Sequence, residues 1–133
     1  MKIVDTAFLI DLSRNKESAI KKSFELDREE RIFCTEISVY ELIMGVCAIK
    51  GIDYNEKIEK LEDMFRRFHL LALDHSSAIK AAEIAGQLVR KGQMISDTDT
   101  MIAGIALSNG IATIITRDKE HFQRIKGMKV ESY

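Results

Sequence analysis

The sequence predicts an α/β fold, a parallel sheet of about five strands with helices on both faces. Short apolar runs alternate with longer stretches whose apolar residues recur at helical spacing. This alternation is typical of parallel sheets, in which a helix connects each strand to the next. The chain has 133 residues, no proline and no repeat or low-complexity segment, so residues 1–133 are expected to form a single domain.

Each strand of the expected sheet corresponds to a short apolar run bounded by charged or turn-forming residues. The runs cover residues 2–5, 31–35, 70–73, 112–116 and 128–131, and the last is expected at an edge. Between them, helical spacing predicts helices over residues 6–13, 15–30, 38–46, 54–68, 74–91, 96–108 and 118–125.

Local signals at helix starts refine this assignment. Asn15 is expected to cap the second helix, with Phe24 facing the core. Ser38 with Glu41, and Ser96 with Asp99, have the spacing of capping boxes. In the helix that Asp74 is expected to begin, the predicted inner face is formed by Ala78, Ala81, Ala85 and Leu88.

The composition excludes several classes of protein. A net charge of −1 gives no overall attraction to nucleic acid, so any such contact needs a local basic patch. The apolar N-terminal run is interrupted by Asp5 and Asp11, so neither a signal peptide nor a membrane span is expected. The two cysteines, Cys34 and Cys47, have no zinc-binding spacing and no disulfide framework is expected, which favours a cytoplasmic location with both thiols buried.

Four carboxylates lie at the ends of apolar segments. Asp5 and Asp118 follow expected strands, whereas Glu41 and Asp99 lie near the starts of expected helices. In a parallel sheet, the carboxyl ends of the strands and the starts of the following helices share one edge, and ligands bind there. The topology therefore predicts that these four residues meet.

Four neighbouring carboxylates repel one another, and a divalent cation relieves that repulsion. Oxygen ligands without nearby histidine or cysteine select Mg²⁺ or Mn²⁺ over zinc. A cation held in this way can activate water against a phosphodiester, so hydrolysis of such a bond is the expected reaction.

Each acidic residue also has a purely structural interpretation as a helix cap. Asp97 is a weaker candidate than Asp99, because side chains two residues apart on a helix point in widely different directions. Asp11 is expected to face solvent. His69, His75 and His121 show no ligand spacing and are expected to be surface or capping groups.

Several short segments, in this order, resemble the PIN domain family and its VapC-type toxins of toxin–antitoxin pairs. They are Ile3-Val4-Asp5-Thr6, Ser38-Val39-Tyr40-Glu41-Leu42, Asp99-Thr100-Met101-Ile102-Ala103 and Thr116-Arg117-Asp118. The resemblance covers nearly the whole chain and implies a Rossmann-like, PIN-like sheet.

The resemblance also implies a metal-dependent endoribonuclease that uses Mg²⁺ or Mn²⁺ and hydrolyses RNA. Asp5, Glu41, Asp99 and Asp118 would be its catalytic and metal-binding residues, and Thr6 and Thr116 would support them. It implies further a homodimer neutralised by a cognate antitoxin protein.

Two alternatives remain open at the level of sequence. A receiver-like domain would also bind Mg²⁺, with Asp74 as phosphoacceptor and Thr116 as switch residue, but this interpretation leaves Glu41 and Asp99 unexplained. A non-catalytic PIN-like module would only bind a partner protein.

Overall fold

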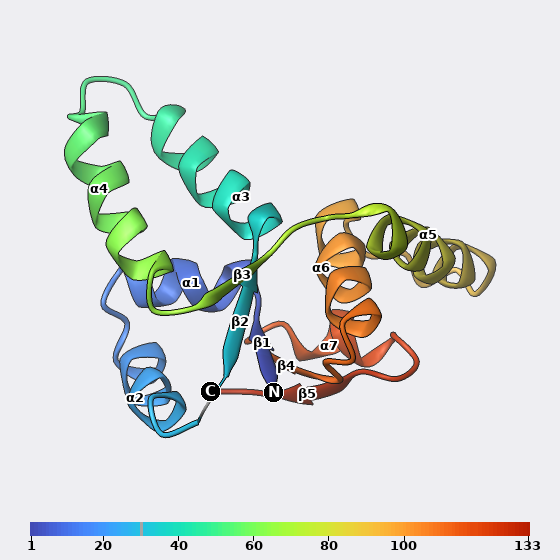
Figure 1. Cartoon of the computed structure of the whole chain (residues 1–133). Helices are drawn as coiled ribbons and strands as arrows, with labels where there is room; N and C mark the ends of the chain where they lie inside the picture. The colour runs from blue at the N-terminus through green and yellow to red at the C-terminus, as the bar shows by residue number, and fades with distance from the viewer. Residues whose placement is uncertain (30) are drawn as a thin grey trace.

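The computed structural model describes residues 1–29 and 31–133 and contains a five-stranded parallel sheet between two layers of helices (Figure 1). The strands are β1 (Lys2–Val4), β2 (Ile32–Thr35), β3 (His69–Leu71), β4 (Thr113–Ile115) and β5 (Lys129–Glu131). Each pair of neighbouring strands is parallel. The expected α/β class and the five expected strands are therefore confirmed.

The helices divide between the two faces of the sheet. Helices α1 (Thr6–Ser13), α2 (Glu17–Leu26), α3 (Glu36–Cys47) and α4 (Tyr54–Phe65) lie on one side in Figure 1. Helices α5 (His75–Arg90), α6 (Asp97–Ser108) and α7 (Lys119–Gln123) lie on the other side. Residue Glu30, the expected end of the second helix, is outside the described residues.

Alternation along the strands produces two separate hydrophobic cores. Val4 and Ile115 belong to the core beneath α1–α4, whereas their neighbours Ile3 and Ile114 belong to the core beneath α5–α7. Successive strand side chains point to opposite faces, so both faces of a central strand must be apolar. This requirement explains why the strands appear in the sequence as continuous apolar runs.

The strand order is β3-β2-β1-β4-β5. The chain moves outward from β1 to β3, then crosses back and continues from β4 to β5. The order therefore reverses between β1 and β4, and the loops that follow these two strands diverge there. Such a reversal leaves a crevice beyond the carboxyl ends of the strands, where open α/β sheets bind ligands.

The expected capping box at Ser38 is wrong. Helix α3 begins earlier, at Glu36, because the Thr35 hydroxyl accepts a hydrogen bond from the Ser38 backbone N–H at 3.2 Å. Ser38 is consequently a buried residue within the first turn. This shift places Glu41 in the second turn of α3.

The expected start of the second helix is also wrong. Asn15 has a positive φ of 57° and forms the turn after α1, and Lys16 precedes α2 without a side-chain cap. Phe24 is 65% exposed rather than buried, whereas Leu26 lies in the core. The positive φ is tolerated because asparagine adopts the left-handed conformation more readily than most residues.

Helices α5 and α6 approach each other closely at Gly104. A Cβ atom at this glycine would lie 2.6 Å from the Cβ of Ala81, closer than packed carbon atoms can approach. The buried face of α5 comprises Ser77, Ala81, Ile84 and Leu88, so Ala81 and Leu88 are on the expected face but Ala78 is exposed. Small residues therefore set the position of α6, whose first turn carries Asp99.

Within the described residues, no helix combines the length and the apolar character needed to cross a membrane.

Candidate metal centre

Asp5 lies at the point where β1 ends and α1 begins, and it is only 3% exposed. Its Oδ1 accepts a hydrogen bond from the Phe8 backbone N–H at 2.9 Å, and its Oδ2 accepts one from the Thr116 hydroxyl. The carboxylate is thus both the N-cap of α1 and a bridge to the end of β4. Capping and a role in the site are compatible rather than alternative interpretations.

Burial is the main cause of the raised pKa of Asp5. The pKa of this carboxyl is raised to about 7: removal from water is the largest cause, the nearby charges of Asp99 and Asp118 act in the same direction, and the bonds from Thr116 and Phe8 oppose the change. A neighbouring cation would therefore strongly stabilise the charged form of this carboxylate.

Glu41 points from the second turn of α3 toward the same edge. The Thr6 hydroxyl donates to its Oε1 at 2.7 Å, and the Thr98 hydroxyl of α6 donates to its Oε2 at 3.4 Å. The Ser38 hydroxyl lies 2.9 Å from that of Thr6 and completes a buried chain of polar groups. Glu41 is therefore oriented by hydroxyl groups of α1 and α6, and not by a capping box.

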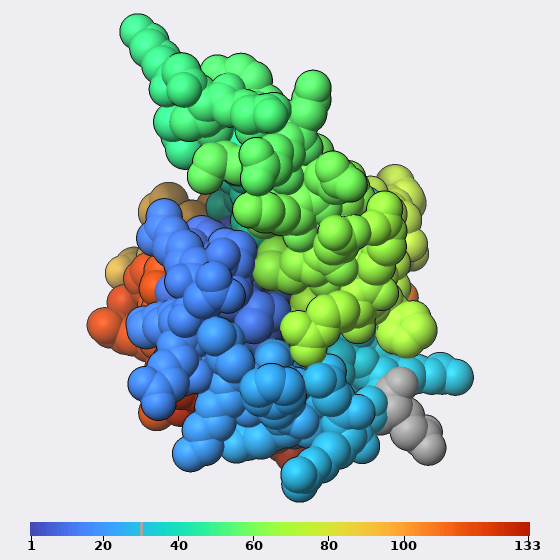
Figure 2. All heavy atoms as spheres, turned by 90° about the vertical axis from the view of Figure 1, so that its left-hand side faces the viewer, coloured from blue at the N-terminus to red at the C-terminus, as the bar shows by residue number. Residues whose placement is uncertain are grey.

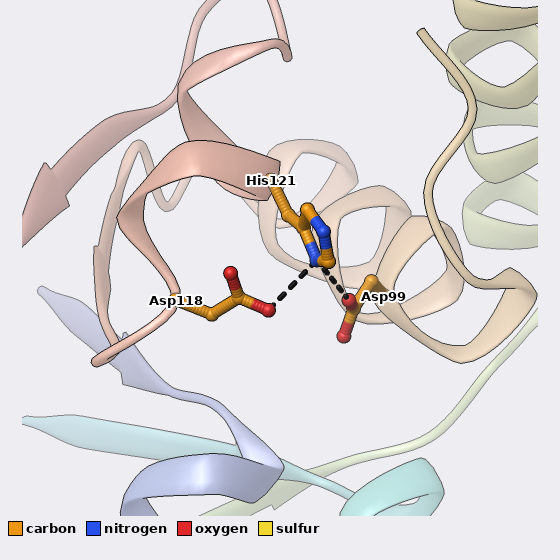
Figure 3. Close-up of side chains that lie close together, drawn as sticks. All are labelled: Asp99, Asp118 and His121. Atoms are coloured by element: carbon orange, nitrogen blue, oxygen red, sulfur yellow. Dashed lines mark ion pairs between the residues drawn. The ribbon is translucent and has the colours of Figure 1, made fainter.

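Asp99 and Asp118 face each other across His121 (Figure 3). The Nδ1 atom of His121 is 2.7 Å from Oδ2 of Asp118 and 3.7 Å from Oδ2 of Asp99. One possible ligand atom from each of the three residues lies within 4.8 Å of the others. Burial raises the pKa of Asp99, and the charges of Asp118 and Glu41 raise it further.

Asp99 and its neighbour Asp97 have different surroundings. Asp97 is exposed, whereas Asp99 is partly buried and lies close enough to Asp118 and Glu41 for their charges to raise its pKa. Ser96 caps α6 by accepting from the Asp99 backbone N–H at 3.2 Å, which leaves the Asp99 carboxylate directed into the site.

His121 is the functional candidate that sequence reasoning missed, since it was expected at the surface or in a cap. Asp118 and His121 are three residues apart at the start of α7, and residues at this spacing share one helix face. The spacing Asp-x-x-His directly after a strand was the signal that could have indicated it.

The loop that carries Asp118 is fixed at several points. The Thr116 hydroxyl accepts from the Asp118 backbone N–H at 2.8 Å. Between them, Arg117 donates to Asp11, which also accepts from the Tyr133 hydroxyl at 2.6 Å. Asp11 is 3% exposed, so its expected solvent-facing position is wrong. The buried Asp11 carboxylate joins α1, the loop after β4 and the C-terminal residue.

The structure therefore brings Asp5, Glu41, Asp99 and Asp118 to one edge of the sheet, with Thr6 and Thr116 hydrogen-bonded to two of them. Asp5 and Asp118 follow β1 and β4, the two strands between which the sheet order reverses. The mutual repulsion of these partly buried carboxylates fits a divalent cation, and carboxylate oxygens are the ligands that Mg²⁺ and Mn²⁺ prefer.

Comparison with known proteins identifies the family to which the chain belongs. The model of the PIN domain family matches residues 2–128, so the chain belongs to the PIN domain family. A tRNA(fMet)-specific endonuclease VapC of Salmonella typhimurium is 31% identical over 131 residues, which are 98% of this chain and 96% of that protein. Ribonuclease VapC1 of Methanocaldococcus jannaschii is 29% identical and is matched over 96% of this chain and 85% of its own.

Solved structures agree with this assignment. The chain superposes on a DNA-bound VapBC structure from Salmonella typhimurium with a TM-score of 0.85 and 30% identity, covering 98% of this chain and 96% of that one. It superposes on VapBC2 of Rickettsia felis, bound to a promoter DNA fragment, with a TM-score of 0.88. The latter is 21% identical over 99% of this chain and 98% of its own, and it supports the fold alone.

Proposed function

We propose that this chain is a metal-dependent endoribonuclease that hydrolyses RNA, and that it is the toxin of a toxin–antitoxin pair. One observation carries the proposal: carboxylates from four separate segments converge where the strand order reverses, with hydroxyl groups orienting two of them. Relatives 28–31% identical to this chain are named endonucleases or ribonucleases, which agrees with that chemistry.

Asp5, Asp99, Asp118 and Glu41 would hold Mg²⁺ or Mn²⁺. When bound, such an ion supplies a water of lowered pKa and positive charge beside the phosphate that is attacked. Asp5 has both oxygens fixed by Thr116 and Phe8, so it provides a rigid ligand at the base of the site. Glu41, oriented by the hydroxyls of Thr6 and Thr98, would position the attacking water and accept its proton.

Hydrolysis adds the water oxygen to phosphorus and breaks the bond from phosphorus to the 3′ oxygen. The leaving oxygen takes up a proton, so the products carry a 5′-phosphate and a 3′-hydroxyl. Transfer RNA is the substrate class to test first, because relatives from Salmonella typhimurium and Shigella flexneri are named tRNA(fMet)-specific endonucleases.

The two acids at the start of α6 provide a matched test. Replacing Asp99 by Asn removes a charge from the site, and replacing Asp97 by Asn removes an equal charge two residues away from an exposed position. With Mn²⁺ and a tRNA substrate, we expect D99N to lose roughly 100-fold in cleavage rate and D97N to resemble the parent. Equal losses, or a loss only in D97N, would contradict this assignment of the site.

The partners are a cognate antitoxin protein and a second copy of the chain. Helices α1–α4 form a groove of about 1130 Å³, and Glu41 is one of the residues that line it. Figure 2 views the molecule from this side, with α1 and α2 in blue below and α4 in green above. Leu42, Val46 and Ile49 line the groove. Charged residues of both signs also line it: Lys57 and Lys60, Asp63, and the ion pair of Arg67 with Asp27. An antitoxin bound there would cover Glu41 and block the substrate.

No observation favours the receiver-like alternative. Asp74 follows the edge strand β3, and its carboxylate accepts from the backbone N–H and the hydroxyl of Ser77 in a capping box. Thr116 is engaged with Asp5 and Asp118. The non-catalytic alternative predicts a parent protein that is inert toward tRNA with Mn²⁺ but still binds a partner, and the cleavage assay therefore decides it.

A further inference from the structure

His121 has an unusual position among the acidic side chains. Its Nδ1 is buried and has no hydrogen-bond partner in the described part of the chain, although Oδ2 of Asp118 is only 2.7 Å away. The same nitrogen is 3.7 Å from Asp99, and Figure 3 shows both contacts starting from it. The distance to Asp118 is that of a strong hydrogen bond, but the direction is not.

A shared ion explains a contact that is short but misaligned. A ring N–H that donates a hydrogen bond points at its acceptor, whereas two ligands of one ion each point at the ion and not at each other. Around an octahedral Mg²⁺ with ligand atoms about 2.1 Å away, adjacent ligand atoms are about 3.0 Å apart and opposite ones about 4.2 Å. The Nδ1 atom of His121 lies 2.7 Å from Oδ2 of Asp118 and 3.7 Å from Oδ2 of Asp99, which is close to the separations expected between ligand atoms of one ion.

We propose that His121 binds the divalent ion directly through Nδ1, together with Asp99 and Asp118. The inference rests on the proposed metal dependence and extends it from oxygen ligands alone to a mixed set of oxygen and nitrogen. The backbone supports this role because α7 presents Asp118 and His121 on one face, and the hydroxyl of Thr116 fixes the start of that helix.

A nitrogen ligand changes the metal preference of the site. Imidazole suits transition metals better than it suits Mg²⁺, which prefers oxygen ligands and keeps its waters. A site with His121 in place should therefore bind Mn²⁺ more tightly than Mg²⁺. Removal of the imidazole should weaken Mn²⁺ binding strongly and Mg²⁺ binding little.

The test compares His121→Ala with His75→Ala, which removes an exposed imidazole from the start of α5. Titration of the full chain with Mn²⁺, followed by the electron paramagnetic resonance signal of free Mn²⁺, gives the affinity, and displacement by Mg²⁺ gives the selectivity. We expect H121A to lose roughly tenfold or more in Mn²⁺ affinity and H75A to retain it. Circular dichroism spectra confirm that both variants are folded.

Pulsed electron paramagnetic resonance of bound Mn²⁺ provides a second, direct measurement. The parent and H75A should show the modulation from a directly coordinated ¹⁴N nucleus, and H121A should lack it. Bound Mn²⁺ without ¹⁴N modulation in the parent, or modulation that persists in H121A, would overturn the role of His121 but leave the metal site intact. A parent that binds no Mn²⁺ would overturn the proposed metal dependence, and the inference with it.

Discussion

At the scale of single residues, Asp5 combines two roles that have opposite effects on stability. Its hydrogen bonds with Phe8 and Thr116 hold α1 and the end of β4 together, but its charge is buried beside Asp99 and Asp118. A buried charge without a compensating cation destabilises the folded state. The metal-free protein should therefore be limited in stability by its own candidate site.

This conflict predicts how the stability of the metal-free protein depends on pH. The folded pKa of Asp5 is about 7, against about 3.8 in an unfolded chain, so between these values the folded state holds the proton more strongly. The free energy of unfolding should fall as pH rises through this window, by on the order of 4 kcal/mol over the whole window and about 3 kcal/mol between pH 5 and pH 8. The raised pKa of Asp99 acts in the same direction. Chelator-treated protein followed by urea unfolding at pH 5 and pH 8 measures the difference.

Asp5→Asn is the matched variant for this prediction. Its side-chain oxygen can still accept from Phe8, but it carries no charge, so its metal-free stability should be equal to or above that of the parent at pH 8 and should change less with pH. Saturating Mn²⁺ should stabilise the parent and not D5N, because only the parent gains binding energy in the folded state. A large loss of stability in metal-free D5N would show that capping by Asp5 outweighs its charge.

The sequence predicted residues of this site where the signal was local. Asp5 and Asp118 directly follow apolar strands, and the meeting of strand ends at one edge is a consequence of parallel topology. Asp11 and His121 were misjudged because their surroundings come from distant parts of the chain. Asp11 is buried by Arg117 and Tyr133, and His121 contacts Asp99 only because α6 and α7 pack together.

At the scale of secondary-structure elements, the contact between α5 and α6 determines where Asp99 lies. Gly104 permits this contact, since a side chain there would collide with Ala81. The spacing of small residues indicated a buried helix, and α6 is indeed buried along most of its length. The start of α3 was less predictable, because Thr35 and Ser38 both have capping side chains and only tertiary structure selects Thr35.

Gly104→Ala and Gly86→Ala form a matched pair of helix substitutions. A Cβ at Gly104 meets Ala81 at 2.6 Å, so G104A should lower the free energy of unfolding by about 1–3 kcal/mol. A Cβ at Gly86, within α5, meets nothing within 4 Å, so G86A should raise stability by about 0.4–1 kcal/mol through the entropy of the unfolded chain. Urea unfolding measures both variants. Equal effects in the two would show that helix propensity, and not the close contact, decides the outcome.

At the scale of the whole molecule, the candidate site and the groove meet at Glu41. This residue lines the groove between α1–α2 and α3–α4, and it also contacts Thr98 of α6. A protein segment that fills the groove therefore reaches one member of the acidic set, which gives a direct physical route from partner binding to inhibition. The sequence predicted the partner only by resemblance, because a groove depends on how four helices pack and leaves no local signal.

Two exposed isoleucines, one inside the groove and one outside it, provide a matched test of where the antitoxin binds. Ile49 lines the groove and is 46% exposed, whereas Ile79 on α5 lies outside it and is 49% exposed. Because an unpaired charge resists burial in an interface, Ile49→Asp should weaken inhibition by the cognate antitoxin at least about tenfold. Ile79→Asp should leave inhibition near that of the parent. Both variants should cleave RNA at the parent rate without antitoxin, since neither residue belongs to the acidic set.

The measurement is the antitoxin concentration that halves the rate of tRNA cleavage with Mn²⁺, determined for the parent, I49D and I79D. Weaker inhibition of I49D alone would place the antitoxin in the groove. Unchanged inhibition of I49D, or a loss of inhibition confined to I79D, would show that the antitoxin binds another face. Inhibition would then not occur through coverage of Glu41 in the groove. Since the cleavage rate without antitoxin is measured in the same series, a fault in the catalytic site is separated from a fault in partner binding.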